Sequence, residues 1–425
     1  MGITQVHIPD MISGDLPPSR IEGEIPFSKI NGAPVSVLDY GATGDGTTDD
    51  TQAIQDAIDA GYVIYFPPTA GGYKVSSATL TIPSNRTLLG DYGKTKIIHA
   101  NGSWLFDIAG SFVTINGFQF DCTAVTSDSV GIFRLRSDTL SMEYITISNI
   151  YTNSATRVIA DVASSNVIVN LNLKNWSCRL HRGNAVYLQT VFAYLQVEEV
   201  TVDFVGGSVR NYTAFRVENN QGSRWTQCDV TGGDITGTTS SQHGFLFNNC
   251  IAVWMYGCMA DTCGGNGFYL YDNCSYFYFE NCVASLCDGF GFGCGEADGG
   301  TTYQLRLSNC TVQGRRLQTY KTSDKSAYTF DSCDTVQLSN CEAVDSTGDG
   351  FYMNGTVRYN MSNCRGDTNS LYGMASSGSS NGLVTGCSFY GNVTDNAALA
   401  TTTDHIVSCV NNAGAVFSLT GPGTA

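Results

Sequence analysis

The stretch Gln304-Leu-Arg-Leu-Ser-Asn-Cys310 contains the pattern that decides the fold. Leu305 and Leu307 alternate with polar residues, as in a half-buried strand, and a small polar corner residue, Asn309, then precedes an apolar one. The arrangement returns every 22 to 31 residues, with these corner residues: Asn149, Asn175, Asp203, Gln227, Gly257, Asn281, Asn309, Asn340, Asn363, Gly386 and Ser408. Such a repeat predicts an all-β solenoid, a parallel β-helix of about 12 coils.

Cysteine follows the corner in eight consecutive turns, which accounts for half of the sixteen cysteines. Neighbouring coils are about 4.8 Å apart, so we expect a line of buried, free thiols. Ligands of a metal must converge on a point, and we therefore expect no metal site there. The stack consists of Cys228, Cys258, Cys282, Cys310, Cys341, Cys364, Cys387 and Cys409.

One turn departs from the pattern. Val200 and Val202 have the wrong phase for a corner at Asp203. We expect a wider corner in that coil.

Composition excludes several classes of partner. The 425 residues carry a formal charge of −16, which repels nucleic acid and anionic membranes. No stretch of about 18 apolar residues exists to insert into a membrane. Met1 is not followed by a basic start and an apolar run, so no secretory signal is expected. No phosphate loop or dinucleotide fingerprint is present, and we expect no cofactor.

The chain divides into four segments. Residues 1–35 contain five of the nine prolines, which fix φ and donate no backbone hydrogen bond, so we expect an extended arm that docks on a partner. Residues 36–87 hold a predicted capping helix and the strands that lead into the solenoid. Residues 88–395 form the β-helix, and residues 396–425 form a last coil and a short tail.

Residues 39–51 read Asp-Tyr-Gly-Ala-Thr-Gly-Asp-Gly-Thr-Thr-Asp-Asp-Thr and precede the helix, which Asp49 or Asp50 can cap. With Tyr65-Phe-Pro-Pro68, this run resembles the start of pectate-lyase-like right-handed parallel β-helices. The resemblance covers about 60 residues closely and implies a right-handed parallel β-helix. It does not specify a reaction, since that family includes lyases, hydrolases and phage tailspikes.

The proline-rich arm before this run resembles the virion-attachment end of a phage tailspike or depolymerase. What this implies is a homotrimer on the virion tail, assembled in the host cytoplasm and fixed by residues 1–35 to a tail adaptor or baseplate protein. It would recognise and depolymerise a host surface polysaccharide. Two alternatives are a receptor-binding tailspike without catalysis and a bacterial polysaccharide lyase or glycoside hydrolase.

Four aromatic residues have outward phase on two adjacent coils: Trp254, Tyr256, Tyr276 and Tyr278. Exposed aromatic residues in such number imply a contact. We expect a trimer interface there, and a platform on which sugars stack is the alternative.

A second group of polar and aromatic residues lies along another set of strands and the turns before them. Rings can stack on sugars, and guanidinium groups can hold carboxylates, so this group suits an extended, anionic oligosaccharide. The predicted substrate-binding residues are His181, Arg182, Tyr187, Arg216, His243 and Tyr269.

The reaction stays open at this level. Hydrolysis needs two carboxyl groups about 5–9.5 Å apart, and Glu218 with Asp234, or with Asp288 a coil or two further on, are the predicted catalytic residues. A lyase would instead need a base such as His181, His243, Tyr187 or Tyr269 beside an arginine. Binding without cleavage is the third possibility.

Overall fold

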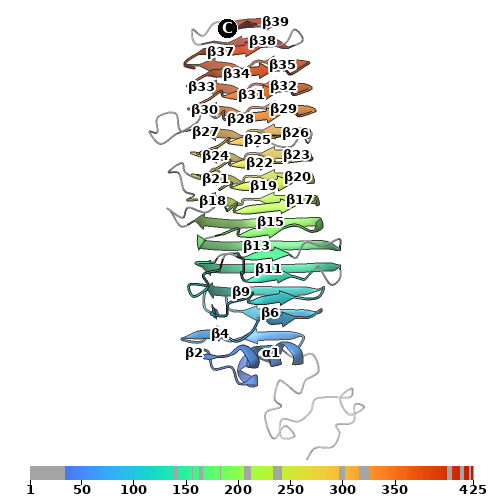
Figure 1. Cartoon of the computed structure of the whole chain (residues 1–425), viewed down its shortest axis with the longest axis vertical. Coiled ribbons are helices and arrows are strands. Elements are labelled where there is room, and N and C mark those ends of the chain that lie inside the picture. Colours follow the sequence, from blue (N-terminus) through green and yellow to red (C-terminus); the bar gives the residue numbers. More distant parts are fainter. Residues whose placement is uncertain are drawn as a thin grey trace, which may run out of the picture.

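The protein is a right-handed parallel β-solenoid of about 12 turns, which confirms the predicted fold class. The structure, a computed structural model, describes residues 34–127, 129–136, 141–155, 157–161, 166–181, 183–204, 212–232, 242–295, 302–314, 326–399, 404–411, 416–420 and 423–424. Its coils are stacked in one column, from α1 (Thr51–Ala60) at one end to β39 (Val416–Thr420) at the other (Figure 1). The predicted arm thus lies almost wholly outside the described residues.

One sheet of short strands runs along the column and is called the small sheet below. Its fourteen described strands are β5 (Leu80–Ile82), β8 (Phe106–Ile108), β10 (Phe133–Leu135), β12 (Ile159–Asp161), β14 (Val186–Leu188), β16 (Phe215–Glu218), β19 (Phe245–Asn248), β22 (Phe268–Leu270), β25 (Phe292–Cys294), β28 (Tyr328–Asp331), β31 (Phe351–Asn354), β34 (Tyr372–Ser377), β37 (Asp395–Leu399) and β40 (Gly423–Thr424).

The remaining strands form the large sheet, which continues around the corners. Its described strands are β1 (Val35–Ser36), β2 (Asp45–Asp49), β3 (Val63–Phe66), β4 (Gly72–Val75), β6 (Arg86–Gly90), β7 (Lys96–His99), β9 (Val113–Asp121), β11 (Met142–Asn153), β13 (Val167–His181), β15 (Val191–Phe204), β17 (Asn220–Thr226), β18 (Asp229–Thr231), β20 (Ile251–Tyr256), β21 (Met259–Asp261), β23 (Ser275–Glu280), β24 (Val283–Ser285), β26 (Tyr303–Ser308), β27 (Thr311–Gln313), β29 (Thr335–Ser339), β30 (Glu342–Val344), β32 (Arg358–Ser362), β33 (Arg365–Asp367), β35 (Gly382–Thr385), β36 (Ser388–Tyr390), β38 (His405–Val410) and β39. Pairing between described strands is parallel except at the C-terminal end, where β37 with β40 and β38 with β39 are antiparallel.

The predicted corner residues turn the chain through the left-handed region of backbone space. Asn149, Asn309 and Asn340 have φ of 56°, 54° and 52°, and Gly257 has φ of 61°. Asparagine and glycine adopt this region at the lowest cost, which explains their place in the repeat. Asparagine amides also bond along the stack, as Asn175 Nδ2 donates to Asn149 Oδ1 at 2.6 Å.

The corner predicted at Asp203 is wrong. The residue that takes the corner position in that coil is Glu199 (φ 54°). It lies between residues 198 and 200, which pair with Lys174 and Trp176 on either side of the Asn175 corner. Val200 and Val202 are fully buried. Because these two valines face inward, the corner must lie before residue 200. It is at Glu199, four positions before Asp203, and the predicted wider corner is not needed.

The thiol stack is confirmed. All eight cysteines after the corners are buried, and none of them forms a disulfide. The register places them on one line, since Val283 N donates to Cys258 O and Thr311 N donates to Cys282 O. Each of seven of them contacts the carbonyl oxygen two residues before it, as Cys310 Sγ does with Ser308 O at 3.4 Å. The thiols thus fill the core beside the corner and satisfy a carbonyl group there.

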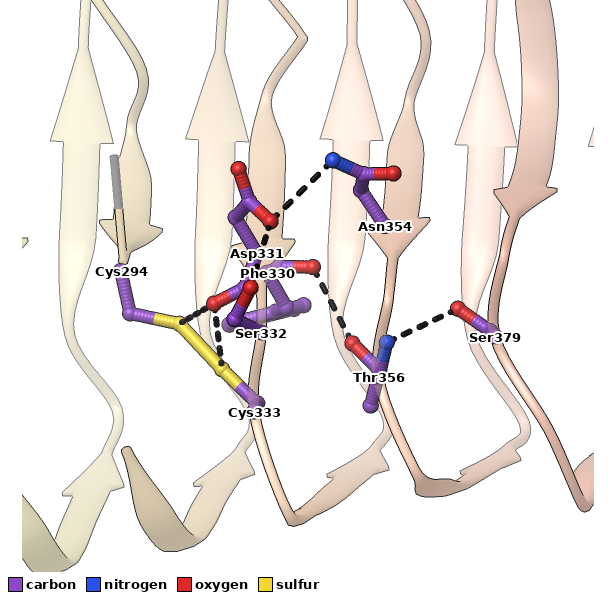
Figure 2. Close-up of a disulfide and its surroundings, with 8 residues drawn as sticks. All are labelled: Cys294, Phe330, Asp331, Ser332, Cys333, Asn354, Thr356 and Ser379. Carbon is purple, nitrogen blue, oxygen red and sulfur yellow. Dashed lines mark hydrogen bonds between the residues drawn. A yellow bond between two sulfur atoms is a disulfide. The ribbon is translucent and has the colours of Figure 1, made fainter. Parts of the chain in front are cut away.

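One disulfide lies outside this stack. Cys294, at the end of β25, is bonded to Cys333 on the next coil (Figure 2). The loop that contains Cys333 is also held by Asp331, whose carboxylate accepts a bond from Asn354 Nδ2 at 3.1 Å. The sequence pattern did not predict this pair.

The helix α1 covers the N-terminal end with Ile54, Ala57 and Ile58, all fully buried. Asp50 occupies the N-cap position, but its carboxylate accepts bonds from the backbone N–H groups of Thr43 (2.6 Å) and Gly44 (3.1 Å). Asp49 instead accepts from Thr51 N at 3.2 Å. The acidic pair therefore ties the preceding loop to the helix as well as capping it.

Substitution of Asn309 tests the left-handed corner. Asn309→Ala should lower the free energy of unfolding by about 1–2 kcal/mol, because an L-residue with a Cβ is strained at positive φ and the bond from Asn340 is lost. Asn309→Gly loses the same bond without the strain and should cost less. Urea unfolding of both variants gives the comparison, and equal losses would contradict strain at the corner.

Candidate functional site

A strip of polar and aromatic side chains lies on the outer face of the small sheet. Inward residues such as Val186, Leu188, Phe215 and Val217 are fully buried, so the residues between them face outward. The register aligns Tyr187 with Arg216, and Arg216 with Leu246, which in turn aligns with Tyr269. We call the set Arg157, Tyr187, Arg216, Glu218, His243 and Tyr269 the polar strip.

Tyr187 lies between two guanidinium groups from neighbouring coils. The Cζ atoms of Arg157 and Arg216 are 5.2 and 5.1 Å from the centre of its ring. Such cation–π contacts each contribute about 0.5–2 kcal/mol and hold the three side chains in line. Burial raises the pKa of Tyr187, so its hydroxyl stays protonated at neutral pH and acts as a hydrogen-bond donor.

Arg216 also binds the carboxylate two residues along the same strand. Its Nε and Nη2 atoms lie 2.8 and 2.7 Å from Glu218 Oε1. Oε2 of Glu218 has no hydrogen-bond partner among the residues that the structure describes. The Glu218 side chain is 18% exposed, and Oε2 is its oxygen that is not bound to Arg216.

His243 is a neutral hydrogen-bond donor. Its Nδ1 accepts the backbone N–H of Asn266 at 3.0 Å, so in the neutral ring the proton is on Nε2. Burial, with a smaller contribution from Arg216, lowers the pKa of His243 to about 4. The ring packs 5.2 Å from that of Tyr269. Because its lone pair is used within the fold, His243 does not serve as a general base.

Of the two other predicted catalytic carboxylates, one lies outside the described residues and the other is several rungs from Glu218. Asp234 lies outside the described residues, as does Arg182, and of His181 only the backbone is described, within β13. Asp288 lies in the turn that leads into β25. In the small sheet, β19 and β22 lie between β16, which carries Glu218, and β25. Asp288 is therefore more than two rungs, or roughly 10 Å, from Glu218 along the axis. That is further than the predicted coil or two and exceeds the carboxyl separation of glycoside hydrolases.

Two residues of this region were missed by sequence reasoning. Arg157 precedes its strand, where alternation gives no phase. Asp161 is a half-buried carboxylate on β12, and its two oxygens accept the backbone N–H groups of Gln189 (2.7 Å) and Thr190 (2.6 Å). Burial raises the pKa of Asp161. Both of its oxygens are occupied, so Asp161 holds the coil after β14 in place and is not a second catalytic group for Glu218.

The aromatic group predicted as a trimer interface faces outward on the large sheet. Trp254, Tyr256 and Tyr276 are 45%, 49% and 43% exposed. Trp254 stacks on Tyr278, with ring centres 5.7 Å apart and planes within 7°, and Arg306 lies over the Tyr278 ring at 5.6 Å. Contact of this face with another subunit stays a prediction.

The described residues contain neither a candidate metal cluster nor a helix that could cross a membrane. No group of three or more His, Cys, Asp or Glu side chains is placed to hold a metal ion within the described part of the chain. In the same residues, no helix has the length and apolar character needed to cross a membrane.

Comparisons with known proteins place the chain among polysaccharide-related β-solenoids. The model of the family described as "Rhamnogalacturonase A/epimerase, pectate lyase-like" matches residues 34–288. The chain is 42% identical over 85 residues to mannuronan C5-epimerase AlgE5 of Azotobacter vinelandii, which is 18% of this chain and 8% of that protein. It is 46% identical over 56 residues to the pre-neck appendage protein of Bacillus phage B103, which is 13% of this chain and 6% of that protein.

The solved structures agree on the fold. The N-terminal fragment of gene product 12 of bacteriophage phi29 superposes with a TM-score of 0.59 at 16% sequence identity, over 91% of this chain and 74% of that one. At this identity the likeness is one of fold.

The buried histidine gives a pH-dependence. The folded chain binds a proton at His243 only near pH 4, whereas the unfolded chain does so near 6.5, so the unfolded state holds more protons in between. The free energy of unfolding should fall as pH drops from 6.5 to 4, by up to about 1.4 kcal/mol per pH unit from this group. His243→Gln, which keeps an acceptor for Asn266 N, should reduce this slope in urea unfolding. Equal slopes for both proteins would contradict the assignment.

Proposed function

The chain belongs to the pectate-lyase-like family of rhamnogalacturonase A and epimerase, and we propose that it is a phage tail protein that binds a host surface polysaccharide and depolymerises it. The observation that carries the proposal is the polar strip. Guanidinium groups, aromatic rings and one carboxylate succeed one another across β12 to β22, along the direction in which an extended polymer would lie.

The matched relatives support both parts of the proposal. One is named as an enzyme that modifies mannuronan, and another as an appendage protein of a phage. On this proposal, residues 1–35 attach the protein to a tail adaptor or baseplate protein on the virion tail, after assembly in the host cytoplasm. Three subunits pack through the aromatic face of the large sheet, where Tyr256 and Tyr276 are exposed beside the stacked pair Trp254 and Tyr278.

A second candidate function is receptor binding without cleavage. It is favoured by the positions of two carboxyl groups: Asp288 is more than two rungs from Glu218 along the axis, and the oxygens of Asp161 are both occupied. The polar strip would then bind the polysaccharide without catalysing its hydrolysis.

Cleavage is tested on polysaccharide from the host envelope. Glu218→Gln should lower the rate of oligosaccharide release by about 100-fold or more, because it removes a proton-transfer group, while binding is retained. Asp288→Asn is the control and should keep full activity. Absorbance near 235 nm would identify the unsaturated product of a lyase. Full activity of Glu218→Gln would contradict its catalytic role, and tight binding without cleavage by the wild type would establish the second candidate.

Assembly is tested by placing charges on the aromatic face. The double variant Tyr256→Glu, Tyr276→Glu should be monomeric by light scattering, because buried unpaired carboxylates are costly at an interface. Tyr92→Glu changes a ring of similar exposure (52%) at another site and should leave the oligomer intact. A double variant that stays trimeric and loses only polysaccharide binding would make this face a sugar platform.

A further inference from the structure

The large sheet has a second line of left-handed residues near the start of its strands, one in each coil from Asn85 to Gln304. Four of them are aromatic and exposed: Phe112, Tyr144, Tyr194 and Tyr276, with φ of 58°, 56°, 63° and 59°. A bulky residue at positive φ costs on the order of 1–2 kcal/mol. In the two coils between Tyr194 and Tyr276 the positions are occupied by Gly222 and Ala252, which have almost no side chain. The line of rings is therefore interrupted.

The interruption forms a groove of about 670 Å³. Tyr194 and Trp254 line it from β15 and β20, and Gly222 and Ala252 leave it open between them. β15 and β20 are two rungs apart, about 9.6 Å. Tyr194 is in register with Gly222 and Ala252, and Trp254 with Arg224, so the two rings lie at diagonally opposite corners of the groove. One face of Trp254 stacks on Tyr278 of β23, so the other face is directed toward β17 and the groove.

A cation lies at the groove. Arg224 and Gln196 both line it, and the register aligns Gln196 with Arg224 and Arg224 with Trp254. Arg224 is exposed and makes no ion pair with any residue that the structure describes. Arg216, Arg358 and Arg365 differ in this respect, since each binds a carboxylate within 3 Å. An unpaired guanidinium in a concave site of a chain with a net charge of −16 is a site for an anion.

We propose that this groove, formed by Tyr194, Gly222, Arg224, Ala252 and Trp254, binds one acidic sugar residue of a polysaccharide. The sugar ring lies against the free face of Trp254, and its carboxylate binds Arg224. The inference rests on the proposed function in taking a polysaccharide as the ligand, and it adds a substrate class, uronic-acid polymers. The groove is on the large sheet and is separate from the polar strip. It lies on the β17 side of Trp254, whereas Tyr276 and Tyr278 lie on the β23 side, so the inference requires that the proposed subunit contact at Tyr256 and Tyr276 leaves the β17 side open.

Trp254 provides a direct readout. Trp176 and Trp225 are 1% and 0% exposed and Trp104 is 7% exposed, so Trp254 is the one tryptophan of the four that a ligand can reach readily. Oligomannuronate and oligogalacturonate are the probes, and manno-oligosaccharide of equal length is the control, since it differs from oligomannuronate by lacking the carboxylate. We expect both uronates to change Trp254 fluorescence and to protect it from iodide quenching, and the neutral sugar to bind about tenfold more weakly or less.

Two variants address the groove without changing Trp254. Ala252→Tyr fills it with a side chain that the same line of residues accepts at Tyr194 and Tyr276, and it should abolish the uronate response. Arg224→Gln should weaken uronate binding about tenfold and remove the preference over the neutral sugar. Arg306→Gln is the matched control, because Arg306 is an outward arginine of the same column, and its uronate affinity should be unchanged.

Three results would overturn the inference. The first is no response to either uronate. The second is equal binding of neutral and acidic sugars, with no effect of Arg224→Gln. The third is dissociation of the oligomer by Ala252→Tyr with uronate binding intact, which would make the groove a subunit contact. Failure of the proposed function is distinguishable. If the wild type neither binds nor cleaves host polysaccharide yet Trp254 responds to uronates, the inference stands and the proposed function fails.

Discussion

The structure depends on a left-handed corner residue followed by a small inward one. Before the corner, Leu305 and Leu307 are inward, and after it Cys310 and Val312 are inward, so the corner shifts the inward phase by one residue as it turns the chain. Two sheets of different direction can then face one core. In eight coils the inward residue next to the corner is a cysteine whose thiol can reach a nearby carbonyl group, whereas Trp176 fills the same position in another coil.

Stacked coils turn every outward position into a line of side chains at about 4.8 Å intervals. Side chains on such a line contact each other along the axis, as Tyr187 does between Arg157 and Arg216, and Trp254 on Tyr278. This arrangement suits a polymer that contacts several rungs. It does not readily bring three metal-ligating side chains to one point. The same geometry separates carboxyl groups by whole rungs, which is why Glu218 and Asp288 are not a hydrolytic pair.

The repeat in the sequence predicted the features that depend on it directly. These are the solenoid, the thiol stack and the outward direction of Tyr187, Arg216 and Trp254. The prediction failed at Asp203, where a polar residue was taken as the corner. The burial of Val200, and not the polarity of the corner residue, determines which residues of that strand face inward. Prediction also failed across turns of unequal length. Sequence spacing does not predict the rung of Asp288, the neighbour of Arg157 or the bond between Cys294 and Cys333. Each depends on the path of a turn whose length differs from coil to coil.

Net charge limits how an acidic polysaccharide can be bound. A chain of charge −16 repels a polyanion at distances beyond contact, so attraction must come from arginines that are not neutralised by a neighbour. Arg216 is partly neutralised by Glu218, whereas Arg224 is not paired with any described residue. The long-range repulsion is screened within about 8 Å at physiological salt, while a guanidinium–carboxylate contact against Trp254 is screened less. The charge of the chain therefore disfavours diffuse binding of anionic polymers and leaves the contacts in the groove and the polar strip to determine which glycan is held.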